Sequence, residues 1–230
     1  MKNRSAGFGL IEIMISLVLG LVILLGVTQI FVSAKTTYVT QNASSIMQED
    51  ARFVLSKMVQ EIRMVGMFGC LQTVLDSSTN SDFRAAQTTP ISWDSATGTL
   101  TLISAASSTT GTVPNWTIRS DCKSSATAYS GVSTPTSGQL AFPIRRLVYR
   151  FANAQITLGN QPLVSNVTAF NLLFGLANNA SDNAVTSYSA NPPDPALIRS
   201  VNIALTLSDP AGKVSAQRFS VVAALRNRLK

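Results

Sequence analysis

Carboxylates are the first candidates for acid–base chemistry in this chain, because its 230 residues include no histidine. The lack of imidazole excludes Ser-His-Asp triads, Cys-His pairs and the zinc sites that are built on histidine. Beyond Glu61 the acidic residues are single aspartates, mostly next to Ser, Asn or Pro, where aspartate commonly shapes turns. We therefore predict that the chain is not an enzyme and that it has no cofactor and no metal site.

One carboxylate stands in an unusual place. Glu12 is the single ionisable side chain between Phe8 and Ala34, in a segment rich in Ile, Leu and Val. A carboxylate that faces hydrocarbon costs about 2.5 kcal/mol or more, so it persists where a positive group compensates it. Glu12 is therefore the candidate functional residue of this segment.

The segment around Glu12 has the length of a membrane-spanning helix. Residues 13–32 read "IMISLVLGLVILLGVTQIFV", close to the roughly 20 apolar residues that cross a bilayer. Lys2 and Arg4 precede this run, and such residues hold the amino end of a span in the cytoplasm. The sequence predicts a single span with the rest of the protein outside the cytoplasm.

Three interpretations of this segment compete. A cleaved secretory signal, ending at the "VSA" of residues 32–34, would have an apolar region of only about 7–15 residues. A permanent signal anchor, with Glu12 reaching to the interface, leaves the "SAGF" of residues 5–8 without a role. The third interpretation assigns a role to each of these residues.

This third interpretation is a family resemblance carried by residues 7–16, "GFGLIEIMIS". A short basic leader that ends in Gly7, followed by Phe8, a carboxylate at Glu12 and an apolar helix, resembles the type IV prepilin and pseudopilin family. The resemblance implies that a prepilin peptidase cuts between Gly7 and Phe8 and methylates the new amine. It also implies that Glu12 pairs with the Phe8 amine of a neighbouring subunit during assembly. Gly9 departs from the more usual Thr or Ser.

The helix is expected to continue beyond the membrane. Residues 35–65 contain no Pro or Gly, and apolar side chains recur there at spacings of three, four and seven. The stripe comprises Met47, Val54, Met58, Ile62 and Val65. We expect an amphipathic half-helix that packs on its own globular domain, with Gly66 and Gly69 ending it.

The remaining sequence predicts a β-rich body. Residues 71–137 are rich in Ser and Thr and predict loops and short strands. Stronger strand patterns occur at residues 145–151, 154–158, 167–176, 200–207 and 216–225, with a turn at 209–213. We expect an α+β protein in which an antiparallel sheet of four or more strands is covered by the amphipathic helix, which is the pilin fold that the resemblance implies.

The expected organisation has four parts. Residues 1–7 form a cleaved leader, 8–34 a transmembrane and filament-core helix, 35–69 its amphipathic continuation, and 70–230 the globular β-rich domain. Residues 50–70 and the carboxyl-terminal half resemble PilW-type minor pilins. A looser likeness links the chain to the large minor pseudopilin of type II secretion systems.

Cys70 and Cys122 are the only cysteines. A body outside the cytoplasm lies in an oxidising compartment, where the two residues can form a disulfide. Two free thiols are the alternative. The net charge of +7 is dispersed, and Arg145 and Arg146 point to opposite faces of a strand, so we expect a solvated basic surface and no nucleic-acid partner.

The resemblance implies a minor pilin that helps to initiate, prime or cap a type IV pilus used in motility, adhesion or DNA uptake. Its implied partners are the prepilin peptidase, other minor pilins, the major pilin, the inner-membrane assembly platform and a tip adhesin. The implied location is the inner membrane, with a periplasmic body, and then the pilus at the cell surface. A type II secretion pseudopilin and a single-span anchored binding protein are the alternatives.

Overall fold

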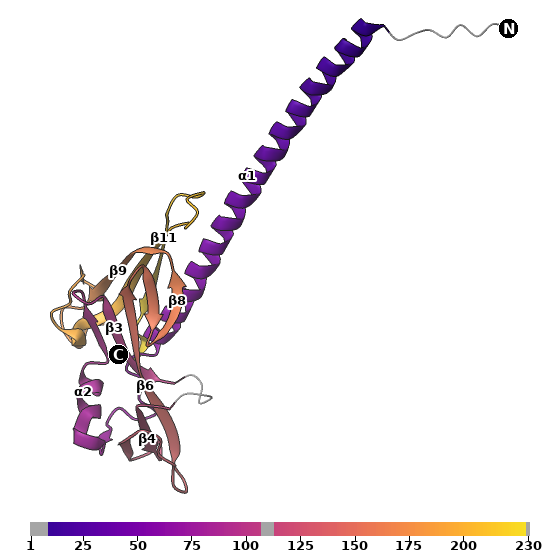
Figure 1. Cartoon of the computed structure of the whole chain (residues 1–230). Coiled ribbons are helices and arrows are strands. Elements are labelled where there is room, and N and C mark those ends of the chain that lie inside the picture. The colour runs from indigo at the N-terminus through magenta and orange to yellow at the C-terminus, as the bar shows by residue number, and fades with distance from the viewer. Residues whose placement is uncertain (1–8, 107–112, 229–230) are drawn as a thin grey trace. The chain divides into compact units, whose positions relative to one another are not determined.

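The computed structural model describes residues 9–106 and 113–228. A long helix, α1 (Leu10–Arg63), comes first, and strands and short helices follow (Figure 1). The chain divides into two compact units, with the division between Ile46 and Met47. A long apolar helix followed by a β-sheet domain confirms the expected α+β, pilin-like fold.

The first unit consists of the amino-terminal turns of α1. Hydroxyl side chains in these turns donate to carbonyls of their own helix, as Ser16 Oγ does to the Glu12 carbonyl at 2.7 Å and Thr28 Oγ1 to the Leu25 carbonyl at 2.9 Å. Each bond satisfies the polar group within the helix itself. The helix therefore presents few unsatisfied polar groups to an apolar environment.

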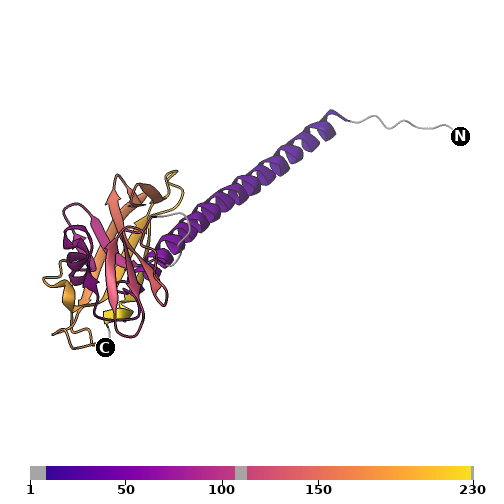
Figure 2. The same ribbon diagram turned by 90° about the horizontal axis from the view of Figure 1, so that it is seen from below.

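The second unit contains two β-sheets (Figures 1 and 2). The large sheet has the strand order β1-β5-β4-β6-β3-β2, and β7 and β8 extend it from β6. Its strands are β1 (Leu75–Asp76), β2 (Ile91–Asp94), β3 (Thr99–Ala105), β4 (Trp116–Ser120), β5 (Ala126–Ser130), β6 (Leu140–Ala152), β7 (Gln155–Leu158) and β8 (Gln161–Ser165). The small sheet has the order β10-β9-β11-β12, with β9 (Val167–Leu176), β10 (Ser187–Ser189), β11 (Ile198–Leu207) and β12 (Gln217–Ala224).

The sheet arrangement differs from the sequence-based expectation in two respects. One antiparallel sheet was expected, but the strands form two sheets, and β1 pairs with β5 in parallel. The Ser/Thr-rich middle third holds short strands, as expected, and these strands, β1 to β5, are members of the large sheet. It also supplies a helix, α2 (Asp82–Thr88), that the sequence pattern did not indicate.

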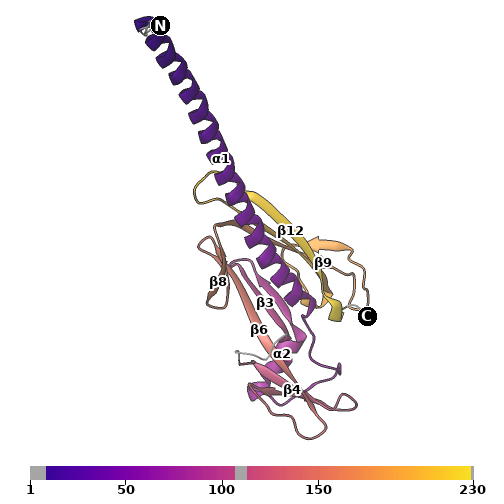
Figure 3. The same ribbon diagram turned by 90° about the vertical axis from the view of Figure 1, so that its right-hand side faces the viewer.

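The carboxyl-terminal turns of α1 pack on both sheets. Met58 and Ile62 are fully buried in a core that also holds Leu102 of β3, Phe174 of β9 and Ile203 of β11. Figure 3 shows this part of α1 between β12 of the small sheet and β3 of the large sheet. The stripe expected from the sequence is thus the buried face of the helix, and it fills the space between the two sheets.

A second, smaller core lies under α2. Phe83 of α2 makes edge-to-face contacts with Phe68 and with Trp116 of β4, at centroid distances of 5.4 and 5.8 Å. The Asp82 carboxylate accepts a 2.7 Å hydrogen bond from Trp116 Nε1. Because β3 and β6 contribute side chains to both cores, these two strands join them into one body.

The end of α1 also differs from the expectation. The helix ends at Arg63, before the expected boundary at residue 69. Val65 then forms an isolated bridge with Ser104, and the Gly66 N–H donates to the Ile103 carbonyl at 3.0 Å. Gly66 has a φ of +75°, a left-handed conformation that suits glycine. The chain therefore leaves the helix early in order to pair with β3.

Candidate functional site

The first candidate surface is the apolar side of the amino-terminal turns of α1. Every Leu, Ile, Val, Met and Phe between Leu10 and Val32 is more than half exposed. Burial of one such side chain contributes about 1.5–3 kcal/mol, and folded monomers rarely leave so continuous an apolar surface in water. Within the described residues, α1 is also the helix that is long and apolar enough to cross a membrane. This surface therefore needs lipid or other helices around it.

Glu12 lies in the first turn of this helix. Its N–H donates to the Gly9 carbonyl at 3.0 Å, and its carbonyl accepts from Ser16, so its backbone is satisfied. Its carboxylate has no partner among the described residues. The two residues of the expected cleavage site, Gly7 and Phe8, lie outside the described residues.

Cys70 and Cys122 form a disulfide, with their Cα atoms 5.4 Å apart. The bond joins the segment that follows α1 to the loop between β4 and β5. The structure therefore agrees with the pairing that was expected from the two cysteines, and the alternative of free thiols does not describe it.

The loop that carries Cys122 is organised by Asp121. Its carboxylate accepts the N–H groups of Lys123, Ser124 and Ser125, each at 2.9 Å. These donors, first among them the Ser125 N–H, hold the pKa of Asp121 well below its usual range. Cys122 has a φ of +55°, so the ionised Asp121 side chain holds a loop whose backbone is in a left-handed conformation.

A polar network lies at the carboxyl-terminal end of α1. The Glu61 carboxylate accepts from Lys57 Nζ at 2.8 Å and from the hydroxyl of Tyr149 on β6. Burial and the adjacent Glu61 charge raise the pKa of Tyr149 far above its usual value. Because both oxygens of Glu61 have donors, we assign this network to anchoring the helix on the large sheet.

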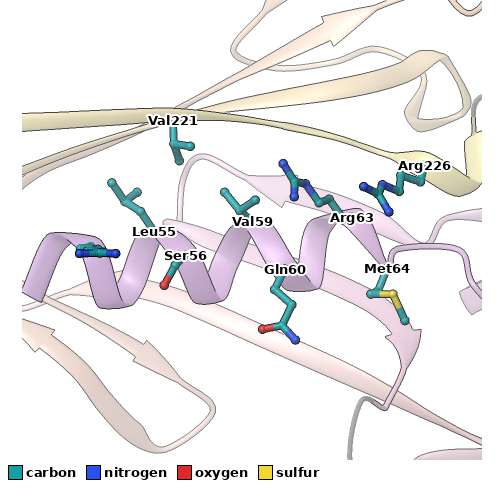
Figure 4. Close-up of a pocket in the computed structure, with 9 residues that line it drawn as sticks. Leu55, Ser56, Val59, Gln60, Arg63, Met64, Val221 and Arg226 are labelled. Atoms are coloured by element: carbon teal, nitrogen blue, oxygen red, sulfur yellow. The ribbon is translucent and has the colours of Figure 1, made fainter.

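A second candidate surface is an open groove between α1 and β12, with a volume of about 700 Å³. Figure 4 shows Leu55 and Val59 pointing from α1 toward Val221 of β12, so the floor of the groove is apolar. Three exposed arginines line its edges, namely Arg52, Arg63 and Arg226. We call this surface the arginine groove.

Other arginines contact the protein itself. The guanidinium of Arg146 lies 5.1 Å from the Trp116 ring, and that of Arg119 lies 4.0 Å from the Tyr129 ring. Arg199 is buried and donates to several backbone carbonyls, including those of Asp182 and Ala196 at 2.7 and 2.9 Å. These side chains stabilise loops and strands of the body.

Sequence reasoning missed two features of these surfaces. Arg52 and Arg63 lie outside the apolar stripe of the helix, and the position of Arg226 in the same groove depends on how β12 packs. Arg199 gave no signal, because a single arginine in a strand does not reveal that its side chain is buried. In the described residues, no group of three His, Cys, Asp or Glu side chains is positioned to hold a metal ion.

Comparison with known families supplies one match. The prokaryotic N-terminal methylation motif matches residues 2–28, which include Gly7, Phe8 and Glu12. No curated protein sequence matches the chain significantly. The described part of the match, residues 9–28, includes the beginning of the exposed apolar helix.

Proposed function

We propose that this type IV pilin-like chain is a minor pilin, a structural subunit that helps to initiate, prime or cap a type IV pilus. The methylation motif at residues 2–28 is the observation that carries the proposal. The motif and the apolar helix support a membrane-anchored subunit of the pilin or pseudopilin type. The minor role rests on the resemblance of residues 50–70 and of the carboxyl-terminal half to PilW-type subunits.

In the proposed mechanism, a prepilin peptidase cuts between Gly7 and Phe8 and leaves a methylated amine on Phe8. The apolar turns of α1 then pass from lipid into a bundle of similar helices. Glu12 meets the Phe8 amine of a neighbouring subunit, and this pairing compensates two charges that would otherwise be buried alone. The exposed apolar side chains between Leu10 and Val32 supply the packing surface.

The proposed partners follow from this mechanism. They are the prepilin peptidase, other minor pilins, the major pilin, the inner-membrane assembly platform and a tip adhesin. The proposed location is the inner membrane, with the amino terminus in the cytoplasm and the body in the periplasm, followed by the pilus at the cell surface.

Sequencing the amino terminus of the protein extracted from membranes tests the proposal. We expect the mature chain to begin at Phe8. A chain that still begins at Met1 would instead support a permanently anchored binding protein, and one that begins at Lys35 would support a released secreted domain.

A pseudopilin of a type II secretion system shares the motif, so a second experiment separates the two systems. A strain in which the gene for this chain is deleted is expected to lose twitching motility and to keep protein secretion. The reverse pattern would assign the chain to the secretion system.

A further inference from the structure

In the described part of the second unit, most acidic side chains accept hydrogen bonds within the protein, but two do not. Eight acidic side chains of this unit accept hydrogen bonds within the protein: Glu61, Asp76, Asp82, Asp94, Asp121, Asp182, Asp194 and Asp209. Glu49 and Asp50 are exposed and accept none from any described residue. Within the part of the chain that the structure describes, these two carboxylates therefore have no hydrogen-bond donor.

Glu49 and Asp50 lie beside an exposed aromatic ring. Phe53 follows them on α1 at spacings of four and three residues, which places the three side chains on one face of the helix. Phe53 is 54% exposed, although the same helix buries Val54 and Met58 completely. We call Glu49, Asp50 and Phe53 the acidic stripe.

The arginine groove carries positive charges, whereas the acidic stripe carries negative ones. Arg52, Arg63 and Arg226 form no ion pair with any described residue, even though Arg52 lies within one turn of Glu49. Arg63 and Arg226 lie at the same end of the groove in Figure 4. Three cations around an apolar floor suit a partner that brings carboxylates together with an apolar side chain.

We propose that the arginine groove of one subunit binds the acidic stripe of a second copy of the same chain. Glu49 and Asp50 would pair with the arginines, and Phe53 would cover the floor formed by Leu55, Val59 and Val221. The carboxylates of the acidic stripe complement the arginines of the groove, and its aromatic ring complements the apolar floor, which is why we choose a second copy as the occupant.

This contact is heterologous, because the stripe and the groove are different surfaces of the same subunit. In a pair joined by this contact, one subunit uses its stripe and the other uses its groove. The inference goes beyond the proposed function, since it uses only residues of the second unit and does not depend on cleavage after Gly7.

Photo-crosslinking in the membrane tests the contact with the full chain. Two versions with different epitope tags are expressed together, and one carries p-benzoylphenylalanine in place of the exposed Gln60, which lines the groove. We expect an adduct with twice the mass of one subunit that contains both tags. The matched control carries the probe at Arg218, an exposed position on β12 that does not line the groove, and should give little of this adduct.

Charge reversal makes the test specific. A groove variant, R52E/R63E, and a stripe variant, E49K/D50K, should each reduce self-crosslinking about tenfold or more. When the groove variant with the probe is expressed with the stripe variant, the reversed charges again match and the mixed adduct should return. All four positions are exposed, and an intact Cys70–Cys122 disulfide by mass reports that each variant is folded.

Several outcomes would overturn the inference. They are no adduct at Gln60, an adduct that contains a lipid or a different protein, and a two-tag adduct whose yield is unaffected by charge reversal. The sequence of the mature amino terminus is read from the same samples, so failure of this contact and failure of the proposed function are seen separately.

Discussion

The Glu12 carboxylate needs a positive partner that the described residues do not supply. Its backbone is satisfied within the helix, and the side chains around it are apolar and exposed. The proposed pairing with the Phe8 amine of another subunit supplies this partner, and an unpaired charge in an apolar segment is costly.

Replacing Glu12 tests this pairing. Glu12→Gln keeps the size of the side chain and removes its charge, and we expect it to reduce incorporation into sheared pili by about tenfold, equivalent to roughly 1.4 kcal/mol. The amount of protein in the membrane should not change, because the apolar helix is intact. Quantitative immunoblots of sheared and membrane fractions provide the measurement.

Glu12→Asp is the matched control, because it retains the charge and should retain part of the incorporation. If Glu12→Gln and Glu12→Ala enter pili as well as the wild type, the carboxylate merely reaches to the membrane interface and has no role in assembly.

Asp121 gives a prediction about pH. Its pKa is lowered in the folded state, so it stabilises the fold fully at a pH above its unfolded value of about 3.9. This contribution is lost as the pH falls through the folded value, because the protonated carboxyl no longer accepts three N–H groups. We therefore expect Asp121→Asn to be less stable than the wild type at neutral pH, with a difference that shrinks below about pH 4.

Denaturant unfolding at pH 7 and at pH 2.5 provides the comparison. Asp182→Asn is a useful control, because the Asp182 carboxylate accepts from the Asn179 side chain at 2.7 Å and not from three backbone N–H groups, so its effect should vary less with pH. A difference between Asp121→Asn and wild type that stays constant across this range would exclude the carboxylate as the cause.

At the scale of elements, the disulfide links the end of the helical region to the β4–β5 loop. Cys70 and Cys122 are 52 residues apart in sequence, so the bond closes a long loop in the unfolded chain. The chain-entropy argument gives a stabilisation of roughly 4 kcal/mol for a loop of this size.

We expect a Cys70→Ser/Cys122→Ser variant to lose roughly that amount in its free energy of unfolding, measured in denaturant. Wild-type protein unfolded in the presence of a reductant is the control and should lose a similar amount. A loss below about 1 kcal/mol would mean that the loop is already ordered in the unfolded state.

The sequence predicts some elements well and others poorly. The expected strand at residues 167–176 coincides with β9, where buried and exposed side chains alternate from Phe170 to Phe174. By contrast, β4 is almost fully buried, so the burial of its side chains does not follow the alternation of apolar and polar residues in "WTIRS". Its assignment depends on its neighbours β5 and β6, which satisfy its backbone in the large sheet.

At the scale of the whole molecule, the two units differ in whether their apolar side chains are exposed or buried. The first unit exposes nearly all of its apolar side chains, whereas the second buries two apolar cores. Association with a membrane should therefore depend on the amino-terminal turns of α1 and not on the body.

A fragment of residues 35–230 tests this division. We expect it to remain in the aqueous phase after detergent phase separation and to retain the Cys70–Cys122 disulfide. The full chain, processed in parallel, should enter the detergent phase. A fragment that enters the detergent phase with its disulfide intact would locate a membrane-binding surface on the body.

The sequence alone determined the apolar helix, the isolated carboxylate at Glu12 and the buried stripe of α1, because each is a pattern of residues within a single element. Only the tertiary structure decided that the strands form two sheets and that Arg226 lines the same groove as Arg52 and Arg63. Those features depend on pairing between distant segments, and pairing is chosen by the packing of the whole body, which local periodicity does not encode.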